Sequence, residues 1–217
     1  MDRLFLHAKC WLVIVLLCGV SSVWSQEDDF RTWTKMKVNY KIDSRFSVSG
    51  DVELRTKDDL DRVDRWGLTV GGTYRACSFL SLGVGYETHL RNVGHTDWKF
   101  RHRYHATATF SYRYQWLKLS LRERFQQTIY KGDTESRLRS RLKLAYAPRK
   151  AMLSPYFSVE LYQSLDDASF WRAARMRYRP GVEIAWSKRW STDVFYCYQH
   201  ESAKNLHIAG VEVGYSF

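Results

Sequence analysis

The last thirteen residues, 205–217, read Asn-Leu-His-Ile-Ala-Gly-Val-Glu-Val-Gly-Tyr-Ser-Phe. From residue 207 onward, one alternate set of positions is apolar and uncharged, and the other set carries the glycines and the single acid, Glu212. An alternation with a period of two predicts a β-strand, because successive side chains of a strand point to opposite faces. The apolar set is Ala209, Val211, Val213, Tyr215 and Phe217.

The same alternation occurs in ten further segments, separated by connections that are short and long in turn. Outer-membrane barrels combine such amphipathic strands with short periplasmic turns and longer external loops. The sequence therefore predicts an all-β fold: a closed antiparallel transmembrane β-barrel of about 10–12 strands. The predicted strands cover residues 33–42, 46–55, 66–74, 79–90, 98–114, 116–130, 136–147, 154–164, 171–186, 190–200 and 205–217.

The number of segments conflicts with the even strand count of bacterial barrels. Three explanations remain open: one segment is not a barrel strand, one strand is missed, or the amino-terminal piece threads the lumen. A soluble sandwich or lipocalin-like barrel would also alternate. It would turn its apolar face inward, however, and would not need arginines on the opposite face of strand after strand.

Aromatic residues gather near both ends of the predicted strands, as in the interfacial girdles of membrane proteins. The set near the long loops is Trp33, Trp66, Trp98, Tyr130 and Trp171.

Residues 1–25 have the features of a cleaved signal peptide. Arg3 and Lys9 give a positive start, and the apolar run 10–20 is too short to span a bilayer. The barrel domain is then residues 26–217. Lipidation at Cys18 is the alternative, which we disfavour because Leu17 stands where a small residue is expected. In the processed chain we expect two free thiols, at Cys77 and Cys197.

The chain carries a formal net charge of +11, which raises the question of nucleic-acid binding. The basic residues alternate with apolar ones inside the strands, so they are expected to line a polar lumen, and we predict no nucleic-acid partner. Residues at equal distances on either side of a predicted turn are expected to stand opposite each other, a rule that we call hairpin reflection. It pairs Lys37 with Asp51, Lys35 with Glu53, Arg141 with Glu160, and Glu160 with Arg175.

Two interpretations of this lumen stay open: salt bridges that brace the barrel, or a basic pocket for an anionic solute or lipid head group. Arginine suits both, because its planar fork binds carboxylate and phosphate bidentately. The inward faces of segments 66–74 and 79–90 hold mainly Gly, Ser and Thr, which leaves room for long side chains from the far wall. The candidate residues are Arg101, Arg103, Arg139, Arg141, Glu160, Arg175 and Arg177, with an acidic cluster of Glu183, Asp193 and Glu212.

Glu123 interrupts an apolar outward face between Leu121 and Phe125. We expect a β-bulge to turn it inward, with a protein contact on the outer face as the alternative. His105 is the histidine clearly inward and mid-strand, but no nucleophile or metal-ligand spacing surrounds it. We therefore expect no catalytic residues, no metal and no cofactor. An outer-membrane enzyme acting on lipid or lipopolysaccharide is the less favoured alternative.

The second half carries Arg-Leu-Arg-Ser-Arg-Leu-Lys-Leu-Ala-Tyr-Ala-Pro (137–148), Ser-Pro-Tyr-Phe-Ser-Val-Glu-Leu-Tyr (154–162) and Met-Arg-Tyr-Arg-Pro-Gly-Val-Glu (176–183). With the Phe-ended last strand, these stretches resemble a family of Gram-negative outer-membrane barrels known as domain of unknown function 2490. The resemblance implies an outer-membrane location and carries over no catalytic residues. We expect as partners outer-membrane lipid, lipopolysaccharide and the barrel-assembly machinery, which would read the strand ending at Phe217, and we expect a monomer.

Overall fold

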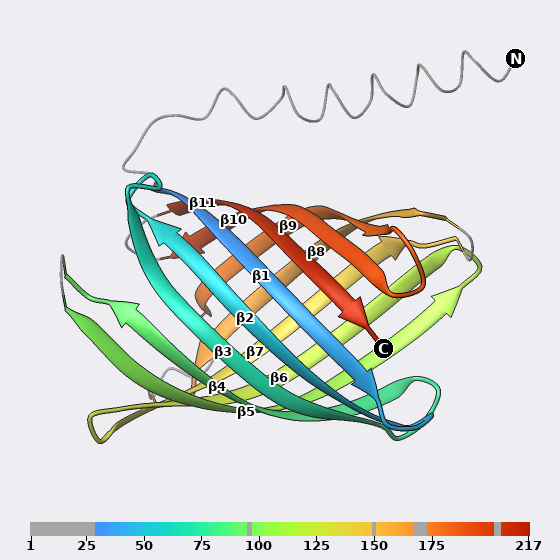
Figure 1. The fold of residues 1–217 in the computed structure, drawn as a ribbon, viewed down its shortest axis with the longest axis horizontal. Helices are drawn as coiled ribbons and strands as arrows, with labels where there is room; N and C mark the ends of the chain where they lie inside the picture. Colours follow the sequence, from blue (N-terminus) through green and yellow to red (C-terminus); the bar gives the residue numbers. More distant parts are fainter. Residues whose placement is uncertain (1–28, 95–96, 149–150, 167–172, 202–204) are drawn as a thin grey trace, which may run out of the picture.

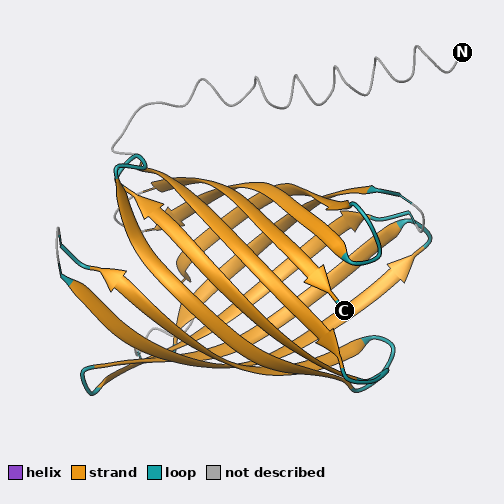
Figure 2. Ribbon diagram, viewed as in Figure 1, coloured by secondary structure: helices purple, strands orange, loops and turns teal. Residues whose placement is uncertain are grey.

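A computed structural model describes residues 29–94, 97–148, 151–166, 173–201 and 205–217. Within these ranges the chain forms eleven strands that close into one barrel (Figures 1 and 2). No helix in the described ranges is long and apolar enough to cross a bilayer. The strands are β1 (Asp29–Lys41), β2 (Phe46–Lys57), β3 (Arg62–Arg75), β4 (Leu80–Asn92), β5 (Trp98–Tyr114), β6 (Leu117–Tyr130), β7 (Asp133–Tyr146), β8 (Leu153–Ser164), β9 (Ala173–Ala185), β10 (Trp190–Glu201) and β11 (Asn205–Ser216).

Strands that follow one another in sequence pair antiparallel, but β1 closes the barrel against β11 in parallel. This parallel ladder runs from Asp29 opposite Leu206 to Asn39 opposite Ser216. With an odd strand number the first and last strands point the same way (Figure 1), so their pairing has to be parallel. The predicted closed all-β barrel of about 10–12 strands is confirmed, and every predicted segment is one of its strands. Only the closing pair, which is parallel, and the odd strand count differ from the expected antiparallel barrel with an even count.

The barrel has two distinct ends. We call the end with the connections after β1, β3, β5, β7 and β9 the short-turn end, and the other end the long-loop end. The expected alternation of short and long connections is not maintained, because only residues 131–132 separate β6 from β7 whereas residues 147–152 join β7 to β8. Most strands match the predicted ranges closely, and the differences lie mainly at the long-loop end, where β3 begins at Arg62 and β7 at Asp133. Polar residues there continue the hydrogen-bonded ladder beyond the point where the apolar alternation stops.

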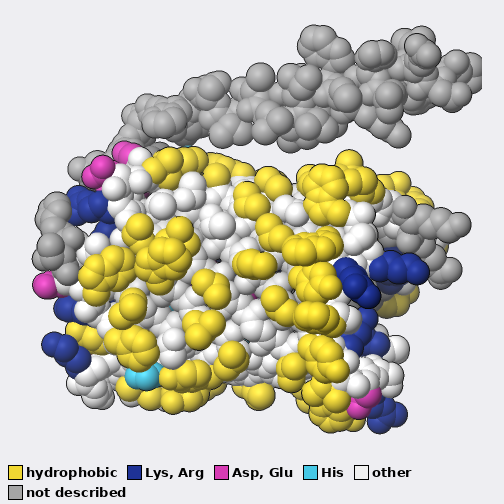
Figure 3. Space-filling view, in the orientation of Figure 1, with side chains coloured by type: hydrophobic (Ala, Val, Ile, Leu, Met, Phe, Trp, Pro, Cys, Tyr) yellow, Lys and Arg dark blue, Asp and Glu magenta, His cyan; other side chains and the backbone are white. Residues whose placement is uncertain are grey.

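The outer face of the strands is apolar, and the charged side chains gather at the two ends (Figure 3). Trp66 and Trp98 are exposed on this face, as the predicted girdle requires. Trp33 and Tyr130 do not belong to the girdle, because both rings lie against inward-facing arginines, Arg55 and Arg101 respectively. Trp171 and the predicted signal peptide lie outside the described residues.

The turn after β1 is held by its own aspartate. The backbone N–H groups of Arg45 and Phe46 donate to Asp43 Oδ1 at 2.6 and 2.7 Å. These two donors favour the ionised carboxylate and lower the pKa of Asp43 below its ordinary value.

A small apolar core lies inside the barrel, against the wall formed by β10 and β11. Phe195, Cys197, Leu206 and Ile208 are buried there and Trp33 packs against them. The Phe195 ring lies across Gly210, where any larger residue would collide with it. Cys77 and Cys197 are both free thiols, as predicted.

Candidate functional site

The lumen contains a cavity of about 470 Å³. Twelve Lys or Arg side chains and seven Asp or Glu side chains from the described residues line it. Basic groups are therefore in excess, and the question is where the excess lies.

The excess lies on the wall built by β6 and β7. Arg122 of β6 stands directly opposite Arg141 of β7, and Arg124 stands opposite Arg139. We call these four residues the arginine block. Like charges at directly opposite positions of neighbouring strands repel one another, so the sheet alone does not favour this arrangement.

Among the described residues, one carboxylate forms ion pairs with the arginine block. Glu160 on β8 is buried, and its Oε1 lies 3.0 Å from Arg139 Nη2 and 3.4 Å from Arg122 Nη2. Its Oε2 lies 3.4 Å from Arg177 Nη1. Arg124 donates to Thr107 Oγ1 at 3.1 Å. Within the described part of the chain, neither Arg124 nor Arg141 has a carboxylate oxygen within 4.0 Å, so the block keeps uncompensated positive charge.

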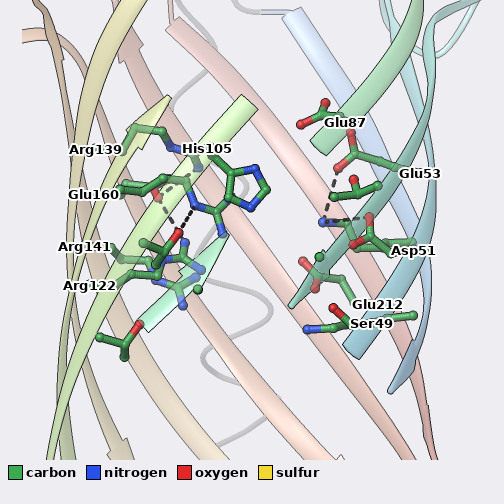
Figure 4. A pocket seen from close by; sticks show the side chains of 18 of the residues that line it. Ser49, Asp51, Glu53, Glu87, His105, Arg122, Arg139, Arg141, Glu160 and Glu212 are labelled. Carbon is green, nitrogen blue, oxygen red and sulfur yellow. Dashed lines mark hydrogen bonds and ion pairs between the residues drawn. The ribbon is translucent and has the colours of Figure 1, made fainter. Parts of the chain in front are cut away.

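The facing wall differs in both bulk and charge. Its β3 and β4 strands present Gly67, Gly71 and Gly83 to the cavity. On β2, Asp51 and Glu53 point toward the arginine block across the cavity (Figure 4). Glu53 already forms ion pairs with basic groups on its own side of the cavity.

Glu53 is bound by three basic groups. Its carboxylate lies 2.7 Å from Arg55 Nε, 2.5 Å from Arg65 Nη2 and 3.5 Å from Lys35 Nζ. Lys35 also lies 4.0 Å from Asp51. The acidic side of the cavity is thus locally neutralised and cannot also serve the arginine block.

The half of the lumen toward the long loops is filled by stacked arginines and aromatic rings. The Trp33 ring lies 3.8 Å from the guanidinium carbon of Arg55 and 4.7 Å from that of Arg177. The Tyr162 ring lies 4.6 Å from the guanidinium carbons of both Arg139 and Arg177. Such cation–π contacts strengthen when they are shielded from water. Buried polar side chains complete this plug: His89, Gln126, Thr128 and Gln199.

The opposite half of the lumen is open. The lumen-facing residues near the short turns, Thr73, Arg113, Lys118 and Ser191, are exposed. The cavity therefore reaches solvent at the short-turn end and ends blindly at the plug.

The predicted acidic cluster forms a single row. Asp193 stands opposite Glu183 on β9 and opposite Glu212 on β11. Arg179 Nη2 lies 2.7 Å from Asp193 and 3.0 Å from Glu212, and Lys143 pairs with Glu183. The Tyr156 hydroxyl donates to Asp193 at 2.9 Å. The cluster is a set of salt bridges at the cavity wall.

The remaining predicted residues lie closer to the long-loop end. Arg103 Nη1 lies 3.0 Å from Glu87, and Arg175 Nε lies 2.7 Å from Glu201. Arg101 lies over the Tyr130 ring, away from the cavity. Of the seven predicted lumen residues, Arg101 and Arg175 lie outside the cavity lining. The other five line the cavity, and four of them gather around Glu160 or are that residue: Arg139, Arg141, Glu160 and Arg177.

The predicted registers are correct in three cases out of four. Lys37 stands opposite Asp51, Lys35 opposite Glu53, and Arg141 opposite Glu160. Arg175 is not the partner of Glu160, because the register places Arg177 there. A register shift between Tyr162 and Gln163 moves the pairing across this connection.

Sequence reasoning missed Arg122 and Arg124, and the reason is Glu123. The pairings of β5, β6 and β7 are continuous around Glu123, so the expected bulge is absent. Glu123 stays on the outer face, where the Ser140 hydroxyl donates to its Oε2 at 2.6 Å. An outward Glu123 turns both neighbouring arginines inward, and the unbroken alternation of β6 was the signal for them.

Two histidines of the described residues lie inside the barrel. His105 lies mid-strand in the lumen, as predicted, with its ring over Gly85. Its Nδ1 is buried and has no hydrogen-bond partner in the described part of the chain. His89 is buried in the plug, with Nδ1 3.5 Å from Glu87 Oε1.

Comparison with known proteins identifies the family of this chain. No curated protein sequence matches the chain. Among solved structures, the translocator domain of autotransporter NalP from Neisseria meningitidis is similar, with a TM-score of 0.46 and 11% sequence identity. That alignment covers 94% of this chain and 93% of the translocator domain. The family model described as a protein of unknown function, DUF2490, matches residues 30–207, and the chain therefore belongs to this family.

Proposed function

We propose that this protein is an outer-membrane barrel whose lumen is a blind, basic pocket that binds an anionic group entering from the short-turn end. The arginine block carries the proposal: four guanidinium groups with one shared carboxylate face a cavity of about 470 Å³. Arg124 and Arg141 are the side chains that a bound anion would engage, because neither has a carboxylate partner in the described residues. If the arginines only braced the barrel through salt bridges, the charges of Arg124 and Arg141 would be left without a carboxylate partner.

The pocket is suited to a small anion with several oxygens, such as a phosphate, pyrophosphate or phosphorylated head group. Arginine binds such groups bidentately, and hydrogen bonds to charged groups are about twice as strong as neutral ones. The glycine wall of β3 and β4 leaves the space into which the anion would fit.

Calorimetric titration of the refolded barrel with inorganic pyrophosphate tests this function. Arg124→Gln and Arg141→Gln are each expected to weaken binding about tenfold or more, since a hydrogen bond to a charged group contributes roughly 1.5–3 kcal/mol. Arg91→Gln is the matched control, because Arg91 is half-exposed at the long-loop end and outside the cavity. Equal affinities of the wild type and the Arg124→Gln/Arg141→Gln double variant contradict the proposal.

Planar-bilayer recording tests the blind end of the pocket. The Arg–aromatic plug predicts no stepwise conductance from the wild type. Trp33→Ala removes the ring between Arg55 and Arg177, and we expect it to produce openings. Stable conductance steps from the wild type are the result that would rule out a closed lumen.

The outer-membrane location and the assembly signal belong to the same proposal. The exposed apolar belt supports the location, and the last strand, whose register reaches Ser216 before Phe217, supports recognition by the assembly machinery. Membrane fractionation with heat-modifiable gel mobility measures both. Phe217→Ala is expected to lower the folded, membrane-inserted fraction, whereas a soluble wild type with no mobility shift excludes the barrel location.

A further inference from the structure

One side of the lumen, formed by the inward faces of β5, β6 and β7, carries no carboxylate over the described stretch from the open short-turn end to the plug. The inward positions within 105–113 of β5, 118–126 of β6 and 137–145 of β7 hold only Arg, Lys, His, Gln, Ser, Thr and Ala. The carboxylates that line the cavity come from β2, β4, β8, β9, β10 and β11. This side of the lumen is therefore free of acid along its whole length.

Basic side chains occur at successive inward steps of this side. Arg113 stands opposite Lys118 at the open end, and Lys143 stands opposite Ser120 one step further in. The two opposed pairs of the arginine block follow. Lys118 and Arg124 are six residues apart on β6, which is about 20 Å along a strand. We call this row the basic track: Arg113, Lys118, Lys143, Arg141, Arg122, Arg139 and Arg124.

The outer end of the track is the pair of Arg113 and Lys118. Both side chains are exposed, and among the described residues neither has a carboxylate oxygen within 4.0 Å. Arg113 Nη1 donates to the Ala147 carbonyl at 2.7 Å, which holds its guanidinium at the end of β7. One step further in, Ser111 Oγ lies 3.3 Å from Ser120 Oγ on the same inward face. The outer pair thus lies on the same wall as the arginine block.

The inner end of the track is the arginine block, where Arg124 and Arg141 also have no carboxylate within 4.0 Å in the described part of the chain. Figure 4 shows Arg141 on the side of the cavity opposite Asp51. Between the two ends the charge is compensated, because Lys143 pairs with Glu183. Unpaired positive charge is therefore concentrated at two places on one wall, and a compact anion is too short to contact both.

We propose that the ligand of the lumen is a linear chain of phosphates that enters by its end and lies along the basic track. Its inner end contacts Arg124 and Arg141, and its outer part contacts Arg113 and Lys118. This inference rests on the proposed function and names the class of ligand for the same pocket.

The chemistry of the wall favours a phosphate chain. Each unit of such a chain carries a negative charge on the chain itself, so the ligand is slender and meets a basic group wherever the wall offers one. Arginine binds phosphate oxygens bidentately. The hydroxyl groups of Thr107 and Thr109, which line the cavity beside the track, are further donors without charge.

Calorimetric titration of the refolded full-length barrel with pyrophosphate, long-chain inorganic polyphosphate and poly-L-glutamate tests the proposal, with affinities expressed per chain. We expect the wild type to bind polyphosphate about tenfold more tightly than pyrophosphate, because the longer chain adds exposed charge contacts at the open end. Its affinity should also fall more steeply with salt, since more phosphates are neutralised.

Arg113→Gln/Lys118→Gln removes the outer end of the track. It is expected to reduce the ratio of the polyphosphate and pyrophosphate affinities about tenfold, because both outer contacts are lost. Lys188→Gln/Arg189→Gln is the matched control. It removes two exposed basic side chains from the turn between β9 and β10, at the same end of the barrel but away from the track. Heat-modifiable gel mobility confirms that each variant is folded before its affinities are compared.

Four results would overturn the track, and they separate it from the pocket itself. Pyrophosphate binding with no gain from chain length rejects the track and leaves the pocket in place. No binding of either phosphate ligand rejects both. An equal fall of the ratio in Lys188→Gln/Arg189→Gln shows general attraction by the basic rim. Tighter binding of poly-L-glutamate than of polyphosphate rejects the phosphate chain as the ligand class.

Discussion

The β6–β7 wall and the β3–β4 wall of the lumen have the same outward pattern but opposite inward chemistry. The first places the arginine block on the cavity, and the second places glycines, serines and threonines there. The two walls depend on each other. Long side chains fit in the lumen because the facing wall is nearly bare. The same holds between neighbouring strands, where the His105 ring of β5 lies over Gly85 of β4. The lesson is that lumen bulk and charge are distributed wall by wall, so a pocket arises where a crowded wall meets a bare one.

The largest effect on stability is expected when the carboxylate shared by the arginine block is removed. Glu160→Gln leaves Arg122, Arg139 and Arg177 without their common partner. We expect a loss of about 3–5 kcal/mol in the free energy of unfolding, the usual cost of breaking a buried ion pair. Urea-induced unfolding in lipid vesicles, followed by tryptophan fluorescence, measures it.

Glu183→Gln provides the comparison for that result. Glu183 is half-exposed and pairs with Lys143 alone, so we expect a loss below about 1 kcal/mol. If both variants unfold at the same urea concentration, Glu160 does not hold the arginine wall together.

A smaller effect is expected from adding bulk to the bare wall. Gly71 lies on this wall, whereas a Cβ on its neighbour Gly72 would point to the outer face. A Cβ on Gly71 would lie 2.9 Å from the Val84 carbonyl oxygen, and one on Gly72 meets no atom within 4 Å. Gly71→Ala is expected to cost about 1–3 kcal/mol through strain. Gly72→Ala should be neutral or slightly stabilising. Equal unfolding midpoints in urea for the two variants would show that the bare wall accepts added bulk as readily as the outer face does.

The smallest effect on stability is expected when the repulsion within the arginine block is relieved. Arg124→Gln removes one of the opposed like charges, so the free energy of unfolding at low salt is expected to rise by about 0.2–1 kcal/mol. The gain should shrink as salt increases, because screening weakens the repulsion that is relieved.

Arg139→Gln is the matched variant for Arg124→Gln. It removes the 3.0 Å contact with Glu160, so it is expected to destabilise the barrel by roughly 1.5–3 kcal/mol. A loss of similar size in Arg124→Gln would mean that its charge is compensated after all. Unfolding at two salt concentrations separates these outcomes.

Much of the fold could be predicted from the sequence, because each strand carries its own period of two. All eleven segments are barrel strands, and hairpin reflection paired Lys35 with Glu53 and Arg141 with Glu160. Reflection succeeds where a connection is short and regular. It failed for Arg175, where a register shift follows Tyr162. The neighbours of Glu123 were missed for a different reason, because the expected bulge is absent.

The sequence by itself determined the strands, their apolar outer face and the polar, basic lumen, because these properties repeat locally along the chain. Only the tertiary structure decided the parallel closure of β1 on β11, since that pairing joins the two ends of the chain. It also decided which charges meet: Glu160 gathers arginines from β6, β7 and β9. Contacts across a lumen depend on the tilt and register of every intervening strand, and no local pattern encodes their sum.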